Sequence, residues 1–173
     1  SPHDGGPLGP DPGDDRFAGV SAADRAALEI ALQLGARLGL PVTAVAAGPL
    51  AAERVLRDAL AAGADRAIRL DMPADSDSRD VAFEVAQVLG GAAVICCGDY
   101  SLDRGSGSVP AFVAHHRRTA QALGLVVVDV SSSDAGSIRA TRRLDGGRRE
   151  LLRIPTPCVL SVEGSVATLR RAP

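Results

Sequence analysis

Residues 92–97 read Ala-Ala-Val-Ile-Cys-Cys, residues 98–108 read Gly-Asp-Tyr-Ser-Leu-Asp-Arg-Gly-Ser-Gly-Ser, and a helical apolar pattern starts at Val109. The apolar run has the length of a buried strand, and the spacing after the loop is that of a helix. In open α/β sheets, ligands bind beyond the carboxyl ends of the strands, where a strand passes through a loop into a helix. We therefore expect this loop to form part of a ligand site.

The same alternation of apolar strands and helices extends outward from this loop. Helices are predicted at 21–38, 50–62, 81–89 and 109–120, and strands at 41–47, 66–70, 94–97, 125–130, 137–144, 148–154 and 157–163. The tripeptide Asp145-Gly146-Gly147 between two of the strands is typical of a β-hairpin. The sequence thus predicts an α/β fold, a three-layer α/β/α Rossmann-like arrangement with a mostly parallel sheet and an antiparallel hairpin near the C-terminus.

The chain length of 173 residues suits one domain. Residues 1–16 are rich in glycine, proline and aspartate, which predicts a flexible N-terminal segment, with a single nucleotide-binding domain at 17–173. The chain has no apolar stretch of membrane length and no signal peptide, so we expect a cytoplasmic protein without membrane insertion.

Composition excludes several kinds of function. The net charge is −2, which gives no general attraction for nucleic acid. All 19 basic residues are arginines, so a lysine-dependent phosphate loop or Schiff base is excluded within this chain. Aromatic residues make up only 2% of the chain, so any flavin must be held mainly by another molecule.

No catalytic arrangement is apparent in the sequence. A Gly-x-Gly-x-x-Gly motif after a strand is missing, and no Ser/His/Asp or paired-carboxylate set can be defined. His115 and His116 are adjacent on a predicted helix and point in different directions, which disfavours a metal pair. Cys96, Cys97 and Cys158 are expected to be inert buried thiols. We therefore expect no enzymatic activity from the chain on its own.

The loop itself has features of a phosphate site. Gly105 and Gly107 allow a ligand to approach the backbone, and the hydroxyls of Ser106 and Ser108 stand at a predicted helix N-terminus, where free N–H groups favour anions. Arg104 would add the charge that no lysine supplies. The alternative interpretation is a solvated loop that caps the helix.

Four separate stretches resemble one family, in order along the chain. They are Gly48-Pro49 with Gly63-Ala64-Asp65-Arg66-Ala67, Ser101-Leu102-Asp103-Arg104-Gly105-Ser106-Gly107-Ser108-Val109-Pro110, Thr141-Arg142 with Leu144-Asp145-Gly146-Gly147, and Pro155-Thr156-Pro157-Cys158-Val159-Leu160-Ser161-Val162-Glu163. Together they are similar to the electron transfer flavoprotein β family, which has an adenine nucleotide α-hydrolase-like fold. The resemblance extends over about residues 20–164.

This resemblance implies a function and a site. A β subunit of this family pairs with an α subunit that carries most of the FAD site, and the pair shuttles electrons from dehydrogenases to an acceptor. The β subunit holds a structural AMP, or a second FAD in the electron-bifurcating branch. The nucleotide contacts implied here are Val20, Ser21, Ala22, Ala23, Ala47, Gly48, Asp99, Ser101, Asp103, Arg104, Gly105, Ser106, Gly107 and Ser108.

Two further comparisons bear on this interpretation. Members of the family begin with an apolar strand, and this sequence has no such run before Phe17.

The alternative function is a stand-alone adenine-nucleotide-binding regulator of the universal-stress type, in which a Gly-Ser-Val loop comes shortly before the last strand. Here the hairpin sequence separates Gly107-Ser108-Val109 from the last strand, which favours the flavoprotein subunit. An unrecognised nucleotide-dependent enzyme is a third interpretation, with no base, nucleophile or metal set to support it.

Overall fold

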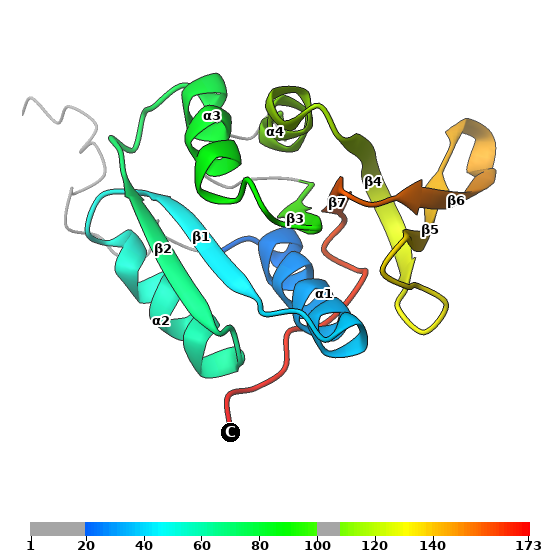
Figure 1. The fold of residues 1–173 in the computed structure, drawn as a ribbon, viewed down its shortest axis with the longest axis horizontal. Helices are drawn as coiled ribbons and strands as arrows, with labels where there is room; N and C mark the ends of the chain where they lie inside the picture. Colours follow the sequence, from blue (N-terminus) through cyan, green and yellow to red (C-terminus); the bar gives the residue numbers. More distant parts are fainter. Residues whose placement is uncertain (1–19, 100–107) are drawn as a thin grey trace, which may run out of the picture.

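The computed structural model describes residues 20–99 and 108–173 (Figure 1). Within these ranges helices and strands alternate up to β4, and strands follow from there. The helices are α1 (Ala22–Leu38), α2 (Ala52–Ala62), α3 (Ser78–Val88) and α4 (Val109–Arg117). The strands are β1 (Thr43–Gly48), β2 (Arg66–Asp71), β3 (Val94–Gly98), β4 (Ala120–Asp129), β5 (Ser137–Arg143), β6 (Arg149–Pro155) and β7 (Cys158–Val162).

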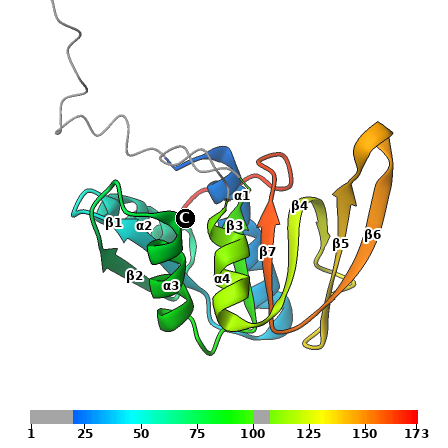
Figure 2. The same ribbon diagram turned by 90° about the horizontal axis from the view of Figure 1, so that it is seen from above.

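The elements form three layers, as predicted. Figure 2 shows α3 and α4 in front of the strands and α1 and α2 behind them. Ile30 and Leu34 of α1 pack with Leu160 of β7 in one core cluster. Val113 of α4 packs with Val159 of β7 in another, on the opposite face. Because side chains point alternately to the two faces of β7, this strand contributes to both clusters, and it is therefore mostly apolar.

The sheet is divided into two parts, whereas the sequence predicted one. β1 and β2 form a parallel pair, and the remaining strands follow the order β3-β7-β4-β5-β6. β3, β7 and the first half of β4 are parallel, while the second half of β4, β5 and β6 are antiparallel. Among the described residues, no strand pairs with the edge of β1 or β3 that lies across this division (Figure 1).

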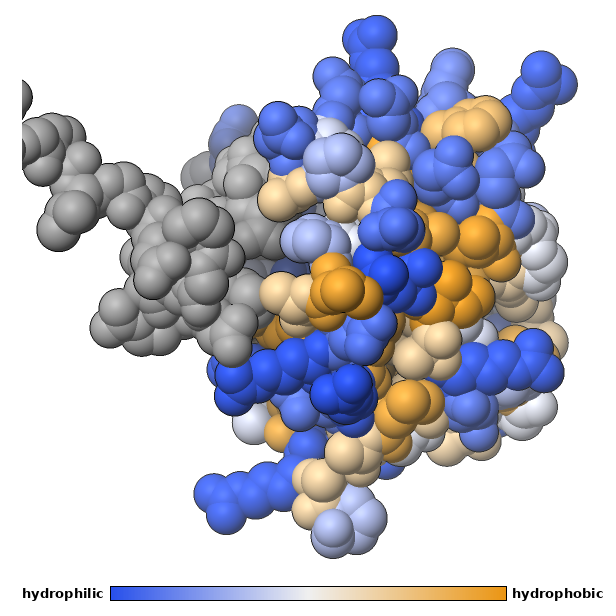
Figure 3. Space-filling model, turned by 90° about the vertical axis from the view of Figure 1, so that its left-hand side faces the viewer, coloured by the Kyte–Doolittle hydropathy of each residue, from blue (hydrophilic) through white to orange (hydrophobic). Residues whose placement is uncertain are grey.

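The division leaves apolar strands only half covered. All five residues of β7 are buried, but β3 has a single buried residue, Ile95, and β1 is half-buried from Thr43 to Ala47. Figure 3 looks onto the β1–β2 side, where hydrophobic residues reach the surface among hydrophilic ones. The physical reason is that a central parallel strand is covered fully only when it has a neighbour on each side, and among the described residues β1 and β3 are each paired on one side only.

Local sequence signals set most element ends. Ser21 caps α1, and Gly39 ends it in the left-handed conformation (φ 67°). One predicted boundary is wrong: Ala120 was placed in the last helix, but it is the first residue of β4. The helix ends earlier, at Arg118, which adopts a left-handed conformation (φ 53°) although it is not glycine. No helix in the described ranges is both long and apolar enough to span a bilayer.

The cysteines differ in exposure from the prediction. Cys158 is buried, but Cys96 and Cys97 are half-buried, because they lie on β3 next to the division of the sheet. Burial nevertheless raises the pKa of the Cys97 thiol to about 12 and that of Cys158 to about 11, and it raises the pKa of Cys96 as well. All three therefore remain protonated at neutral pH.

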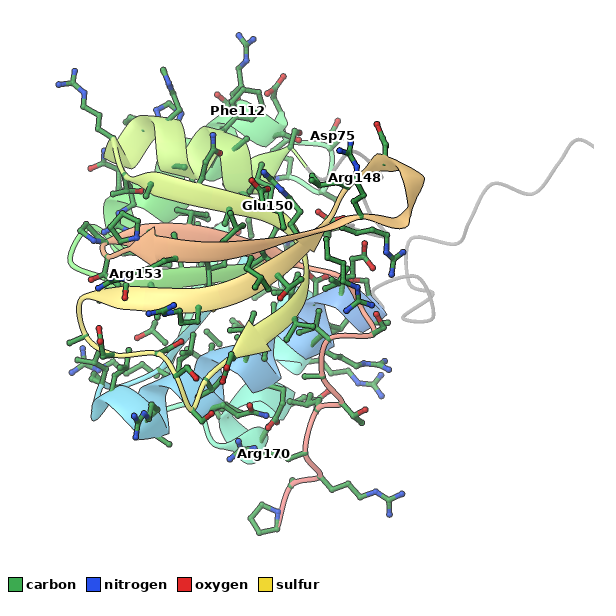
Figure 4. The ribbon with its side chains drawn as sticks, turned by 90° about the vertical axis from the view of Figure 1, so that its right-hand side faces the viewer. Asp75, Phe112, Arg148, Glu150, Arg153 and Arg170 are labelled. Carbon is green, nitrogen blue, oxygen red and sulfur yellow. The ribbon has the colours of Figure 1, made fainter. Side chains whose placement is uncertain are left out.

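An ion pair between Arg170 and Glu29 connects the C-terminal segment to α1. Glu29 is buried in α1, and its carboxylate accepts hydrogen bonds from the Arg170 guanidinium at 2.9 and 3.0 Å and from the Arg170 backbone at 3.0 Å. Gln33 donates a further hydrogen bond at 2.9 Å. Figure 4 shows Arg170 on this segment beside α1. Hydrogen bonding by Arg170, which outweighs burial, lowers the pKa of Glu29 to about 2.

Glu29→Gln should destabilise the protein at neutral pH by about 1–3 kcal/mol, because Arg170 loses its charged acceptor. The folded-state pKa of Glu29 lies below its ordinary value of 4.5. Its contribution is therefore complete above about pH 5 and is lost as the pH falls toward about 2. Urea titrations at a series of pH values should show parent and variant converging as the pH falls. A constant difference between them would contradict this account.

Candidate nucleotide-binding site

The first turn of α1 lies directly against the ends of two strands. A Cβ built on Gly98, the last residue of β3, would lie 2.7 Å from the backbone nitrogen of Asp24 and 2.8 Å from the carbonyl carbon of Ala23. A Cβ on Gly164, just after β7, would lie 2.9 Å from the Cβ of Ala22. Only glycine leaves room for this approach, so both positions fix the helix N-terminus at the carboxyl edge of the sheet.

The N-termini of α1 and α4, both at this edge, differ in charge. In α1 the backbone N–H of Asp24 donates to Ser21 Oγ at 3.0 Å, and the Ser21 hydroxyl lies 2.9 Å from the Asp24 carboxylate. That carboxylate offsets the positive end of the α1 dipole. The first turn of α4 contains no acidic residue, although Pro110 removes one of its N–H donors. An anion is therefore favoured at α4 over α1.

Asp99, which follows β3, is held by a buried serine. Its backbone N–H donates to the Val162 carbonyl at 2.9 Å, and its carboxylate accepts a hydrogen bond from Ser161 Oγ at 3.0 Å. Ser161 is fully buried, and its hydroxyl also accepts the backbone N–H of Gly124 at 2.9 Å. Gly124 stands in the irregular part of β4 in a left-handed conformation (φ 67°). Ser161 thus links the ends of β3 and β7 to the irregular middle of β4.

The end of β1 lies on the same side of the molecule as the end of β3. The first turn of α1 touches Gly98, and its last turn leads through residues 39–42 into β1. Because α1 runs opposite to both strands, their carboxyl ends share one side. The carbonyl of Gly48 accepts a hydrogen bond from Arg69 at 3.0 Å, and Arg69 pairs with Asp71 at 2.8 Å. The hydrogen bond from Arg69 thus connects the end of β1 to β2.

A family model described as the electron transfer flavoprotein domain matches residues 15–172. The chain belongs to the electron transfer flavoprotein domain family. It is 33% identical over 163 residues to the Protein FixA of Rhizobium meliloti, covering 88% of this chain and 55% of that protein. It is 33% identical over 152 residues to the electron transfer flavoprotein subunit beta of Syntrophomonas wolfei, covering 84% and 58%. The corresponding subunit of Mycobacterium tuberculosis strain H37Rv is 32% identical over 130 residues.

These relatives confirm the resemblance to the β family. The chain spans about half the length of the curated relatives that it matches, with shares of 55% and 58% for the first two named. The match begins before α1 and ends beyond β7, so it takes in every described element of the electron transfer flavoprotein domain.

The described residues of the predicted site all lie at the carboxyl edge. Ser21, Ala22 and Ala23 form the start of α1, with Val20 just before it. Ala47 and Gly48 end β1, Asp99 follows β3, and Ser108 precedes α4. The structure brings the α1 start and the β3 end into contact. It places Gly48 across the division of the sheet. Six predicted contacts lie outside the described residues: Ser101, Asp103, Arg104, Gly105, Ser106 and Gly107.

Sequence reasoning missed the residues that hold this edge together. Ser161 is the only polar residue of β7, and a lone hydroxyl in a buried strand signals a required hydrogen bond. The close contacts at Gly98 and Gly164 left no signal beyond a glycine after each apolar run. No cluster of three metal-ligating side chains exists within the described ranges.

Gly98→Ala should destabilise the electron transfer flavoprotein domain by about 1–3 kcal/mol, because the added methyl group collides with backbone atoms of α1. Gly91→Ala is the matched control, since a Cβ there meets no atom within 4 Å. The control should change stability by less than about 0.5 kcal/mol. Urea denaturation followed by circular dichroism measures both variants. Equal stabilities would show that the contact between α1 and β3 is not rigid.

Proposed function

We propose that the chain acts as the β-type subunit of an electron transfer flavoprotein. It pairs with an FAD-carrying α subunit, accepts electrons originating from dehydrogenases and passes them to an acceptor in the cytoplasm. The observation that carries the proposal is the meeting of the α1 N-terminus with the end of β3 in a member of this domain family. The flavin, when bound, supplies the electron-carrying chemistry.

AMP in this site would have a structural role. The fold offers its phosphate the first turn of α4, which has no acidic residue and directly follows the loop that contains Gly105 and Gly107. The glycines and the hydroxyls of Ser106 and Ser108 would contact the phosphate, with Arg104 adding charge. Asp99 is already engaged by Ser161, so it holds the start of the loop in place. The described polar groups bond to one another, which suits a binding site better than a catalytic one.

A regulator of the universal-stress type is the weaker proposal. The structure has the antiparallel pair β5 and β6 between α4 and β7, with a register that extends from Ser137–Pro155 to Arg143–Arg149. Together with β4, this pair separates the loop from the last strand by three strands. This insertion was the feature that favoured the flavoprotein subunit in the sequence.

Gly107→Val should abolish AMP binding, because the side chain obstructs the approach of the phosphate to the backbone. Ser106→Ala should weaken binding by about 1–2 kcal/mol, the contribution of one hydrogen bond to a charged group. Calorimetry with AMP on refolded, nucleotide-free protein measures both changes. Gly91→Ala is the control and should bind like the parent. If Gly107→Val binds AMP as tightly as the parent, the phosphate lies elsewhere.

The purified single chain should be colourless, and it should contribute to a yellow complex only together with an α subunit. The physical reason is the shortage of aromatic side chains, which are 2% of the chain. We would measure the absorbance between about 350 and 500 nm, where oxidised flavin absorbs. The measurement is made before and after mixing the chain with the flavin-loaded α subunit that is encoded nearest in the same genome. Size-exclusion chromatography detects the pair. Stoichiometric FAD on the single chain would contradict the assignment.

A further inference from the structure

Among the described residues, no helix lies over one face of the antiparallel part of the sheet. Ile138, Ala140 and Ile154 point to the inner side, where they pack in the cluster that contains α1. Because side chains alternate along a strand, residues 139, 141 and 143 of β5 and 149, 151 and 153 of β6 lie on the outer side. Figure 2 shows β5 and β6 standing beyond α3 and α4, and Figure 4 shows the hairpin from its open side with Arg153 on β6.

Arginines oppose each other twice on this outer face. Arg139 pairs across the strands with Arg153, and Arg143 pairs with Arg149. All four side chains are exposed, and none forms an ion pair with a described residue. Like charges directly opposite each other destabilise a sheet. Charge on an edge strand protects against aggregation, but β6 alone would serve that purpose, and the arginines of β5 only add repulsion.

Two exposed apolar side chains, Val127 and Leu151, lie between the two arginine pairs, one on each side of the buried Thr141. Thr141 is paired with Leu151 of β6 on one side and with Val127 of β4 on the other. Leu151 is 84% exposed, the largest exposure among the large hydrophobic side chains described, and Val127 is 40% exposed. We define the outer patch as Val127, Leu151 and the arginines 139, 143, 149 and 153.

Nearby carboxylates neutralise only one end of the outer patch. Attraction to the positive charge of Arg139 contributes to lowering the pKa of the Asp129 and Asp134 carboxyls. Attraction to Arg153 contributes in the same way at Asp134. The Arg153 guanidinium also donates to the Ser137 hydroxyl at 3.2 Å. Arg143 and Arg149 have no such partner among the described residues. On the inner face, by contrast, Arg142 is paired with Glu150. The inner face thus pairs its opposite charges within the chain and needs no charge from a binding partner.

We infer that the outer patch is a docking surface for a partner protein with an apolar ridge flanked on both sides by carboxylates. The two arginine pairs are four residues apart along the strands, about 13 Å. A helix with its side chains is about 10–12 Å wide, so it fits between them with its acidic flanks against the arginines. Arginine is favoured at protein interfaces, and opposite charges from the partner would relieve the repulsion within the patch. This inference does not depend on the nucleotide site.

Nucleic acid and a second copy of the chain fit less well. A nucleic-acid surface would add aromatic side chains for stacking to the basic residues, and the outer patch has an aliphatic centre instead. A second copy would set four arginines against four arginines if the same patch met itself, as a two-fold interface requires.

The test titrates the full 173-residue chain with a synthetic helical peptide of about 18 residues, long enough to hold a helix. The peptide has a leucine stripe flanked by glutamates, and its matched control has glutamines in their place. The protein variants are Leu151→Gln and Arg149→Glu, with Leu60→Gln as the control. Leu60 is exposed on α2, on the opposite face. Calorimetry measures affinity, and urea midpoints report folding.

We expect the acidic peptide to bind the parent and the Leu60→Gln control equally, and both patch variants about tenfold more weakly. Raising salt from about 50 to about 300 mM should weaken binding to the parent. Arg149→Glu should keep or raise the urea midpoint, because it replaces a repulsive cross-strand pair with an attractive one; a merely structural role for Arg149 would lower it.

Four outcomes would overturn the inference. In the first, the acidic peptide does not bind the parent. In the second, the glutamine peptide binds as tightly as the acidic one, and in the third, both patch variants bind the acidic peptide as tightly as the parent does. In the fourth, the peptide does not bind, but heparin does, and Leu151→Gln does not change the heparin affinity. Sedimentation equilibrium then measures the oligomeric state of the parent and of Arg149→Glu. A dimer of the parent that Arg149→Glu dissolves would assign the outer patch to a second copy and reject a different partner.

Discussion

The contact between the first turn of α1 and the ends of β3 and β7 is the constraint on which the candidate site depends. Gly98 and Gly164 lie so close to residues 22–24 that no larger side chain fits at either position. The contact sets the helix N-terminus at the carboxyl edge, and the length of α1 then determines where β1 begins. Ser161 completes this edge by bonding both Asp99 and the irregular part of β4. Described residues of the candidate site that are distant in sequence therefore lie on one side of the molecule.

The division of the sheet has consequences for packing. Within the described ranges β1 and β3 each keep one unpaired edge, and their apolar residues stay half-buried, whereas β7 between two neighbours is fully buried. The β1–β2 half is joined to the rest by α1 and its following turn. The ion pair of Glu29 with Arg170 adds a second attachment, since it holds the C-terminal segment along the same helix. α1 is thus shared by both halves, as is α3, which follows β2 and packs against β3 and α4.

The outer face of β5 and β6 carries like charges opposite each other. Arg142 and Glu150 form an ion pair on the inner face, but Arg143 and Arg149 oppose each other beside the exposed Leu151 on the outer face. A sequence that keeps local conflicts in one place usually does so for a function. The candidate nucleotide site and this face would then serve different purposes, one holding a ligand and the other a protein partner.

The sequence by itself determined the element order, the capping of α1 by Ser21, the Gly63 end of α2 and the hairpin at Asp145–Gly147, because these depend on local backbone preferences and apolar spacing. The quoted family segments also identified the family. Only the tertiary structure decided that the sheet divides between β1 and β3, that Cys96 and Cys97 are half-buried, and that β4 begins at Ala120. It alone revealed the bond between Ser161 and Asp99. Strand neighbours and long-range hydrogen bonds join residues as far apart as Glu29 and Arg170, which are separated by 141 positions, and periodicity along the chain carries no record of such pairings.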